Sequence, residues 1–148
     1  MAQFVGQNTN TINSEVNSDF FGKLQVVQLQ KNFNYLNNVS EDTLIAALND
    51  AIIEVDYDLA KTTKQFNNLA EFVVAHRLKE AQIMHLYQKA VFNKAITHIL
   101  TIEITSNDTK EAAERVANLN ERIEVHNTSA RTAIAMLQSD RKIKVEVV

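Results

Sequence analysis

Apolar residues recur with helical spacing through most of this chain and alternate strictly only at its end. Between residues 41 and 65 large apolar side chains return every three or four positions, the period of one helix face. The members are Leu44, Leu48, Ile52, Val55 and Leu59. Ser40 precedes this stripe as a good N-cap, with Glu41 and Asp42 in the first turn. The pattern predicts a helix over 41–65.

Three further segments have the same periodicity, so we expect about four helices, over 23–36, 41–65, 69–103 and 108–138. The third is expected as a short helix over 69–78 that leads into a longer one from Lys79. Its end, "HILTIEIT", also alternates like a strand, and we favour helix to about 103. We expect 41–65 and 79–103 to form the core pair with the last helix packed across them, burying Leu48, Ile52, Val91 and Ala95.

The composition agrees with the prediction of an all-α helical bundle in a single domain. The chain of 148 residues has no proline and no cysteine, and its two glycines are Gly6 and Gly22. Beyond Lys23 no residue forces a break, which favours long helices over tight hairpins. A chain of this length can bury a core without disulfides or metals.

The two ends of the chain differ from the helical body. Residues 1–19 are rich in Asn, Thr, Ser and Gln, and we expect a flexible N-terminal arm that is disordered or becomes ordered on a neighbouring subunit. The body then spans 20–148. The tail, residues 142–148, alternates like a strand and needs a partner strand. That partner is either internal, at residues 99–104, or in another chain; we favour the second, as strand addition.

The last predicted helix contains two asparagines one heptad apart, Asn120 and Asn127. If they lie inside an apolar seam, they can specify a partner or a register. The alternative is that they lie at the solvated edge of an ordinary amphipathic face. Such a helix is about 45 Å long, so it bends or extends beyond a compact domain of this size.

No catalytic, cofactor-binding or metal-binding constellation is visible in the sequence. The four histidines are His76, His85, His98 and His126, and they form no HExxH or Glu-x-x-His pattern. There is no glycine-rich phosphate loop and no GxSxG elbow. The net charge of −3 is scattered, no segment is apolar enough for a membrane span, and no signal peptide is visible. We therefore expect a protein that acts by contact rather than an enzyme.

The order of three segments resembles a known family. They are "FFGKLQVVQLQKNFNYLNNVSEDTLIAALNDAIIEVDYDL" (20–59), "LYQKAVFNKAITHIL" (86–100) and "RTAIAMLQSDRKIKVEVV" (131–148). They are similar to the head completion, or head stabilisation, proteins of temperate contractile-tailed phages, of the gpL type. The matching positions are Ala47, Leu48, Ala51, Ile52, Val55, Leu59, Tyr87, Lys89, Ala90, Val91, Ala133 and Ile134. Gly22 and Gln30 depart from the family pattern, which commonly has Pro and Arg there.

This resemblance implies a structural virion protein at the neck, or portal vertex, that is assembled in the host cytoplasm. It implies a head–tail connector that forms a dodecameric ring under the portal after DNA packaging and offers an attachment surface for a neck or tail-completion protein. Double-stranded DNA would pass through the channel without specific binding. We expect the portal and subunit interfaces to involve Ile143, Lys144, Val145, Glu146, Val147, Val148, Asn120 and Asn127. The alternative function is a small helical interaction module or regulator that acts through the seam of the last helix.

Overall fold

The computed structural model describes residues 13–33, 36–105 and 110–138, and within them the chain is mainly helical with one β-hairpin. The strands are β1 (Glu15–Ser18) and β2 (Gly22–Gln25). The helices are α2 (Val26–Asn32), α3 (Glu41–Asp58), α4 (Ala60–Thr63), α5 (Leu69–His76), α6 (Glu80–Thr105) and α7 (Lys110–Gln138).

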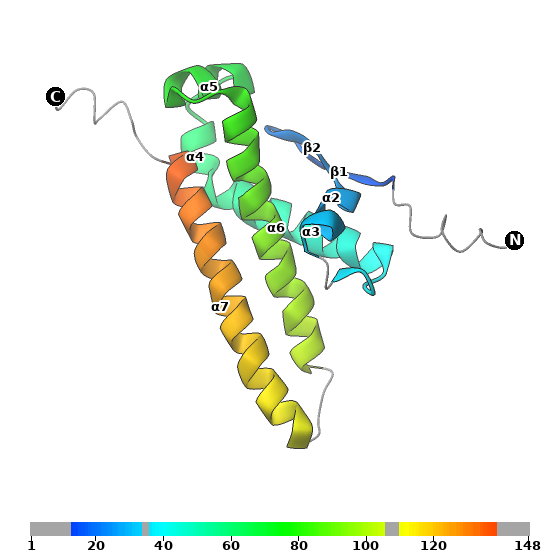
Figure 1. Cartoon of the computed structure of the whole chain (residues 1–148). Coiled ribbons are helices and arrows are strands. Elements are labelled where there is room, and N and C mark those ends of the chain that lie inside the picture. The colour runs from blue at the N-terminus through cyan, green and yellow to red at the C-terminus, as the bar shows by residue number, and fades with distance from the viewer. Residues whose placement is uncertain (1–12, 34–35, 106–109, 139–148) are drawn as a thin grey trace, which may run out of the picture.

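The two longest helices, α6 and α7, are antiparallel and pack side by side along their length (Figure 1). Their 26 and 29 residues correspond to about 39 and 44 Å. Helix α3 crosses behind α6, and the β-hairpin lies beside α6 on the same side as α2 (Figure 1). The C-terminal end of α6 and the N-terminal half of α7 project beyond α3, which gives the molecule an elongated shape (Figure 1).

The core lies where α3, α6, the hairpin and the second half of α7 meet. The four side chains that the apolar spacing predicts as buried, Leu48, Ile52, Val91 and Ala95, are all buried. Small side chains at Ala90 and Ala95 allow close approach of neighbouring helices. The expected pairing of α3 with α6 is confirmed. The last helix packs along α6 rather than across both helices.

Caps define the ends of the shorter helices. The Ser40 hydroxyl accepts a hydrogen bond from the Thr43 amide at 3.2 Å, as expected for the N-cap of α3. The Asn68 side chain accepts one from the Glu71 amide and caps α5. At the other end of α5, Arg77 adopts a left-handed conformation with φ of 57°. This residue separates α5 from α6 without a glycine or proline.

The hairpin corrects the expected all-α fold class, because the body is mainly helical but includes two paired strands, and it corrects two expected boundaries. Residues 15–18 belong to the folded body rather than to the arm, and the first helix is Val26–Asn32 rather than 23–36. Val16 and Leu24 are paired across the strands, and both are buried. The turn ends at Gly22, whose φ is +93°, a conformation that side chains disfavour.

Helix lengths also differ from the expectation. The second helix ends at Asp58 instead of 65, and α4 follows after a turn at Leu59. The third is two helices, as its short leading segment suggested. The fourth ends at Gln138, as expected. Residues 1–12 of the expected arm and the whole tail over 142–148 lie outside the described residues.

Candidate interaction surfaces

A buried polar node attaches the hairpin to the helices. The Ser18 hydroxyl donates to Asp56 Oδ2 at 2.8 Å, and the Tyr87 hydroxyl donates to Asp56 Oδ1 at 2.7 Å. The Phe21 ring stacks on the Tyr87 ring with centroids 4.1 Å apart. One carboxylate on α3 therefore binds both the end of β1 and the first half of α6, and fixes the position of the hairpin on the helical pair.

Burial governs the protonation of this node. It raises the pKa of the Asp56 carboxyl above its ordinary value, although the hydrogen bonds from Tyr87 and Ser18 act in the opposite direction. Burial also raises the pKa of Tyr87, and the neighbouring Asp56 carboxylate adds to the effect. Tyr87 therefore remains a hydroxyl donor at neutral pH, and the node acts as a structural connection.

His76 links α5 to the last turn of α7. Its Nδ1 lies 2.8 Å from the Phe72 carbonyl oxygen, and its Nε2 lies 2.6 Å from the Leu137 carbonyl oxygen. The imidazole is buried and stacks on the Phe72 ring at 3.9 Å. Because Leu137 immediately precedes the end of α7, this contact fixes the point from which the C-terminal tail leaves the body.

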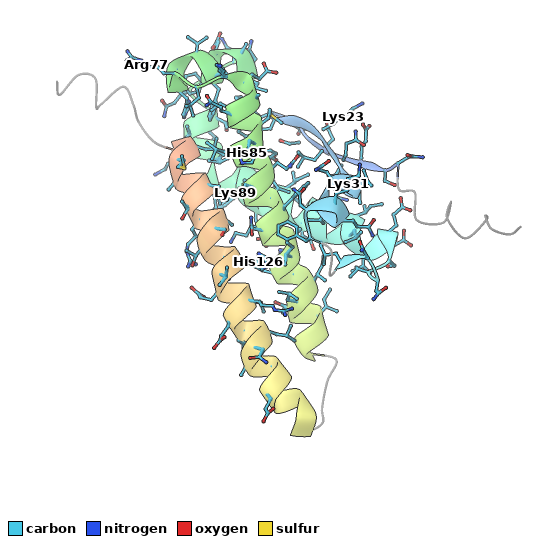
Figure 2. The ribbon with its side chains drawn as sticks, viewed as in Figure 1. Lys23, Lys31, Arg77, His85, Lys89 and His126 are labelled. Carbon is cyan, nitrogen blue, oxygen red and sulfur yellow. The ribbon has the colours of Figure 1, made fainter. Side chains whose placement is uncertain are left out.

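A groove of about 390 Å³ lies between α2, α6 and α7. His126 Nδ1 on α7 lies 2.8 Å from Asn93 Oδ1 on α6, and the Phe33 ring meets His126 edge-on. Burial lowers the pKa of His126, and the positive charge of Arg122 lowers it further. His85 and Lys89 of α6 lie on the same side of the molecule as His126 (Figure 2).

The remaining histidine, His98, lies on α6, where its Nε2 is 2.9 Å from Glu54 Oε2 of α3. His85 and His126 thus line one groove, whereas His76 and His98 lie in two other places. Within 13–33, 36–105 and 110–138, no group of three or more histidine, aspartate or glutamate side chains is arranged to hold a metal ion. In that part of the chain, no helix is long and apolar enough to cross a membrane.

The residues proposed from sequence as interface positions are only partly described. Asn120 is exposed, and Asn127 is half-buried on α7. The preceding residue, Leu119, is the buried one. The other proposed interface positions, Ile143–Val148, lie outside the described residues.

The outer face of α3 is a further exposed surface, which the sequence pattern did not predict as a contact site. Ile53 is 67% exposed and Tyr57 is 81% exposed, one helical turn apart and opposite the buried stripe. Their exposure could have been predicted from the sequence, because both apolar residues fall outside the spacing of three or four residues that relates Leu48, Ile52 and Val55. An exposed apolar pair of this kind is a candidate contact surface.

Taken together, these features define a small, mainly helical protein with a β-hairpin, a projecting helical pair and an exposed apolar helix face. Residues 16–148 match the family described as "Phage head completion protein (GPL)". No curated protein and no solved structure matched the chain.

The family match covers most of the chain, so this protein belongs to the phage head completion protein family. The family indicates a structural role in the virion and contact with other virion components. The resemblance noted in the sequence is thereby confirmed.

Proposed function

We propose that this protein is a head–tail connector subunit. In this proposal, copies of the chain assemble as a dodecameric ring under the portal once DNA has been packaged. The ring extends the DNA channel and offers an attachment surface to a neck or tail-completion protein. The observation that carries the proposal is the family match over residues 16–148.

The shape of the subunit supports assembly into a ring. A closed ring requires two unlike surfaces on each subunit that meet head-to-tail. The projecting pair of α6 and α7 presents one exposed surface, and the outer face of α3 presents a different one. The alternating tail, Ile143–Val148, adds a segment suited to strand addition on the portal or on an adjacent subunit.

One observation weighs against the alternative of a regulator that acts through the seam of its last helix. In the second half of α7 the apolar seam residues are buried inside the subunit, at Ala130, Ala133, Ile134 and Leu137, and Val116 and Ile123 in the first half are partly buried. A helix that packs its seam on α6 has little apolar surface left there for a second protein.

The proposal is tested by imaging the protein after mixing it with its portal and, separately, with DNA-filled heads that lack it. We expect a ring of additional density directly below the portal, with the copy number read from its rotational symmetry. The matched control is the same mixture with heads that already carry the native protein, which should gain no density. Density elsewhere on the head, or a discrete dimer bound to no virion component, would contradict the proposal.

A further inference from the structure

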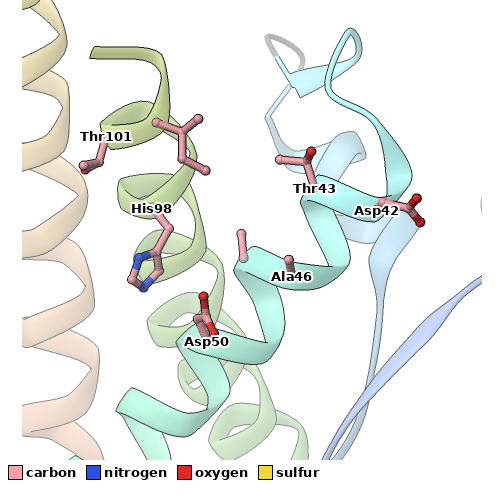
Figure 3. A pocket seen from close by; sticks show the side chains of 8 residues that line it. Asp42, Thr43, Ala46, Asp50, His98 and Thr101 are labelled. Carbon is pink, nitrogen blue, oxygen red and sulfur yellow. The ribbon is translucent and has the colours of Figure 1, made fainter. Parts of the chain in front are cut away.

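An open groove lies in the angle between the first half of α3 and the second half of α6. Its volume is about 460 Å³. Ala46 and Ala47 of α3 and Ile102 of α6 provide its apolar lining, and Asp42 and Asp50 also line it. Asp50 lies on the side of α3 that faces His98, whereas the Asp42 carboxylate points away from α6 (Figure 3). Ile102 is 57% exposed, which is unusual for a large apolar side chain that lines a concave surface.

The groove continues into the exposed face of α3. Ala46, Asp50, Ile53 and Tyr57 are all exposed and follow one another at intervals of three or four residues. They therefore form one stripe that runs from the groove toward the C-terminal end of the helix. We call the groove and this stripe together the α3 surface.

The charged residues of the α3 surface are all acidic. Helix α3 contains no Lys or Arg, and its acidic residues are Glu41, Asp42, Asp50, Glu54, Asp56 and Asp58. Asp56 is engaged by Tyr87 and Ser18, and Glu54 lies against His98. Asp42 and Asp50 remain exposed beside the groove. A segment that fits here needs apolar side chains for the groove and basic side chains for its edge.

The C-terminal tail of the same chain has this composition. Ile143, Val145 and Val147 alternate with polar residues, and the basic residues are Arg141, Lys142 and Lys144. The tail also starts at the right place, because Gln138, the last residue of α7, donates a hydrogen bond from Nε2 to the Asp58 carbonyl oxygen at 2.8 Å. The end of α7, to which the tail is attached, and the end of α3 are therefore adjacent.

The lengths agree as well. An extended tail places Lys142 about 13 Å and Ile143 about 17 Å beyond Gln138. Along α3, Asp50 lies about 12 Å and Ala46 about 18 Å before Asp58. A tail that runs back along its own α3 thus brings a lysine to the level of Asp50 and an isoleucine to the level of the groove.

From this complementarity of charge, apolar pattern and reach, we propose that residues 141–148 dock on the α3 surface of their own subunit. Attachment of the tail at Gln138 gives it a high effective concentration at the groove, which favours this occupant over a free partner. The docked tail is then held in reserve in the isolated subunit and has to be released before it can join another chain. The docking itself does not depend on the proposed connector function.

Disulfide trapping tests this proposal in the full chain, which has no cysteine of its own. The first pair is Ala46→Cys with Ile143→Cys, and the second is Asp42→Cys with Val145→Cys. The second pair uses an exposed groove position, in case the first disturbs the fold. The control is Thr128→Cys with Ile143→Cys, because exposed Thr128 lies about 15 Å from Gln138 along α7 and is equally within reach. Circular dichroism confirms that each variant is helical.

We expect an intramolecular disulfide in at least one groove pair, formed at least about tenfold faster than in the control, as a fast-migrating monomer on a non-reducing gel. Raising the salt concentration should slow the groove pairs and leave the control unchanged, since basic residues meet acidic ones. Disulfides between chains would assign the surface to a second copy and overturn the proposal. Equal rates in groove pairs and control, or no disulfide, would overturn it too. These measurements use the isolated subunit, so their failure is separate from a failure of ring assembly.

Discussion

At the scale of single residues, position 22 requires glycine because of its backbone conformation and not because neighbouring atoms leave no room for a side chain. Its φ of +93° is disfavoured for residues with a side chain, while an added Cβ would meet no atom within 4 Å. Gly22→Ala should therefore lower the free energy of unfolding by about 1–2 kcal/mol through conformational strain alone. Urea unfolding measures it. Gly22→Asn is the control and should cost less, because asparagine tolerates positive φ better. Equal stability of Gly22→Ala and the parent would contradict this account of the turn.

The protonation of His126 should appear in the pH dependence of stability. Burial and Arg122 lower its pKa in the folded state below the ordinary value of 6.5. As pH falls below 6.5, the unfolded chain binds the proton more readily, so this contribution to stability is present above 6.5 and is lost as pH falls. The difference in unfolding free energy between the parent and His126→Gln should shrink as pH falls from 7.5 toward the lowered pKa.

Urea unfolding at a series of pH values checks this, with His85→Gln as the control for loss of an exposed histidine on α6. Below pH 6.5 the difference in unfolding free energy between parent and His126→Gln should narrow more than the difference between parent and His85→Gln. A difference between parent and His126→Gln that grows as pH falls would reverse the sign and contradict the depressed pKa.

At the scale of elements, the attachment of α5 to α7 depends on one imidazole. In His76→Phe the ring can still stack on Phe72, but it cannot donate to the Leu137 carbonyl oxygen. Loss of such a buried hydrogen bond should cost about 1–3 kcal/mol. Hydrogen exchange should accelerate in the last turn of α7 more than at its middle. His85→Phe, the same change at an exposed position, should alter stability by less than about 0.5 kcal/mol.

The packing of α3 on α6 can be tested at the centre of the core. Leu48 is fully buried, so Leu48→Ala should lower the free energy of unfolding by about 2–5 kcal/mol through lost burial and a residual cavity. Asn49→Ala, at an exposed neighbouring position, is the matched control and should be close to neutral. Thermal unfolding of both variants gives the comparison, and equal melting temperatures would contradict the assignment of this face to the core.

The elements that could be predicted from sequence are those whose apolar pattern is compatible with only one secondary structure. Helix α3 has a cap and a continuous stripe, and the long extent of α6 and α7 follows from uninterrupted periodicity. The hairpin was missed because Val26, Leu29 and Phe33 also fit a helix that begins earlier, and because Val16 stands alone among polar residues. Its stability comes from distant partners, above all Asp56 and Tyr87, which local pattern does not reveal.

The candidate surfaces were harder to predict from the sequence than the helices. A stripe of exposed residues on α3 becomes meaningful only when the groove beside α6 and the end of α7 are placed next to it. The sequence does show that the tail needs a partner, but it cannot show which acidic surface lies within reach. The same limit applies to Asn120, whose exposure depends on the rotation of α7 against α6.

At the scale of the whole molecule, the body and the tail should have separable roles. The described contacts that hold the body together involve residues up to Gln138, so a chain that lacks residues 142–148 should keep its helical content and nearly all of its stability. If the tail engages the portal or an adjacent subunit by strand addition, the same truncation should abolish attachment to DNA-filled heads. Burial of Ile143, Val145 and Val147 could contribute about 1.5–3 kcal/mol each before ordering costs, an effect that a ring of subunits multiplies.

Cosedimentation of the protein with DNA-filled heads measures this attachment. Val145→Asp, which places a charge on the apolar side of the tail, should lose binding as the truncation does. Glu146→Gln, a change on the polar side, should retain it, because alternate residues of an added strand face opposite ways. Since a tail docked on its own α3 has to be released first, Asp50→Asn should bind heads at least as well as the parent. Retention of full binding by the truncated chain would show that the tail is not the attachment element, and failure of that chain to fold would show that the tail is an internal strand of the body.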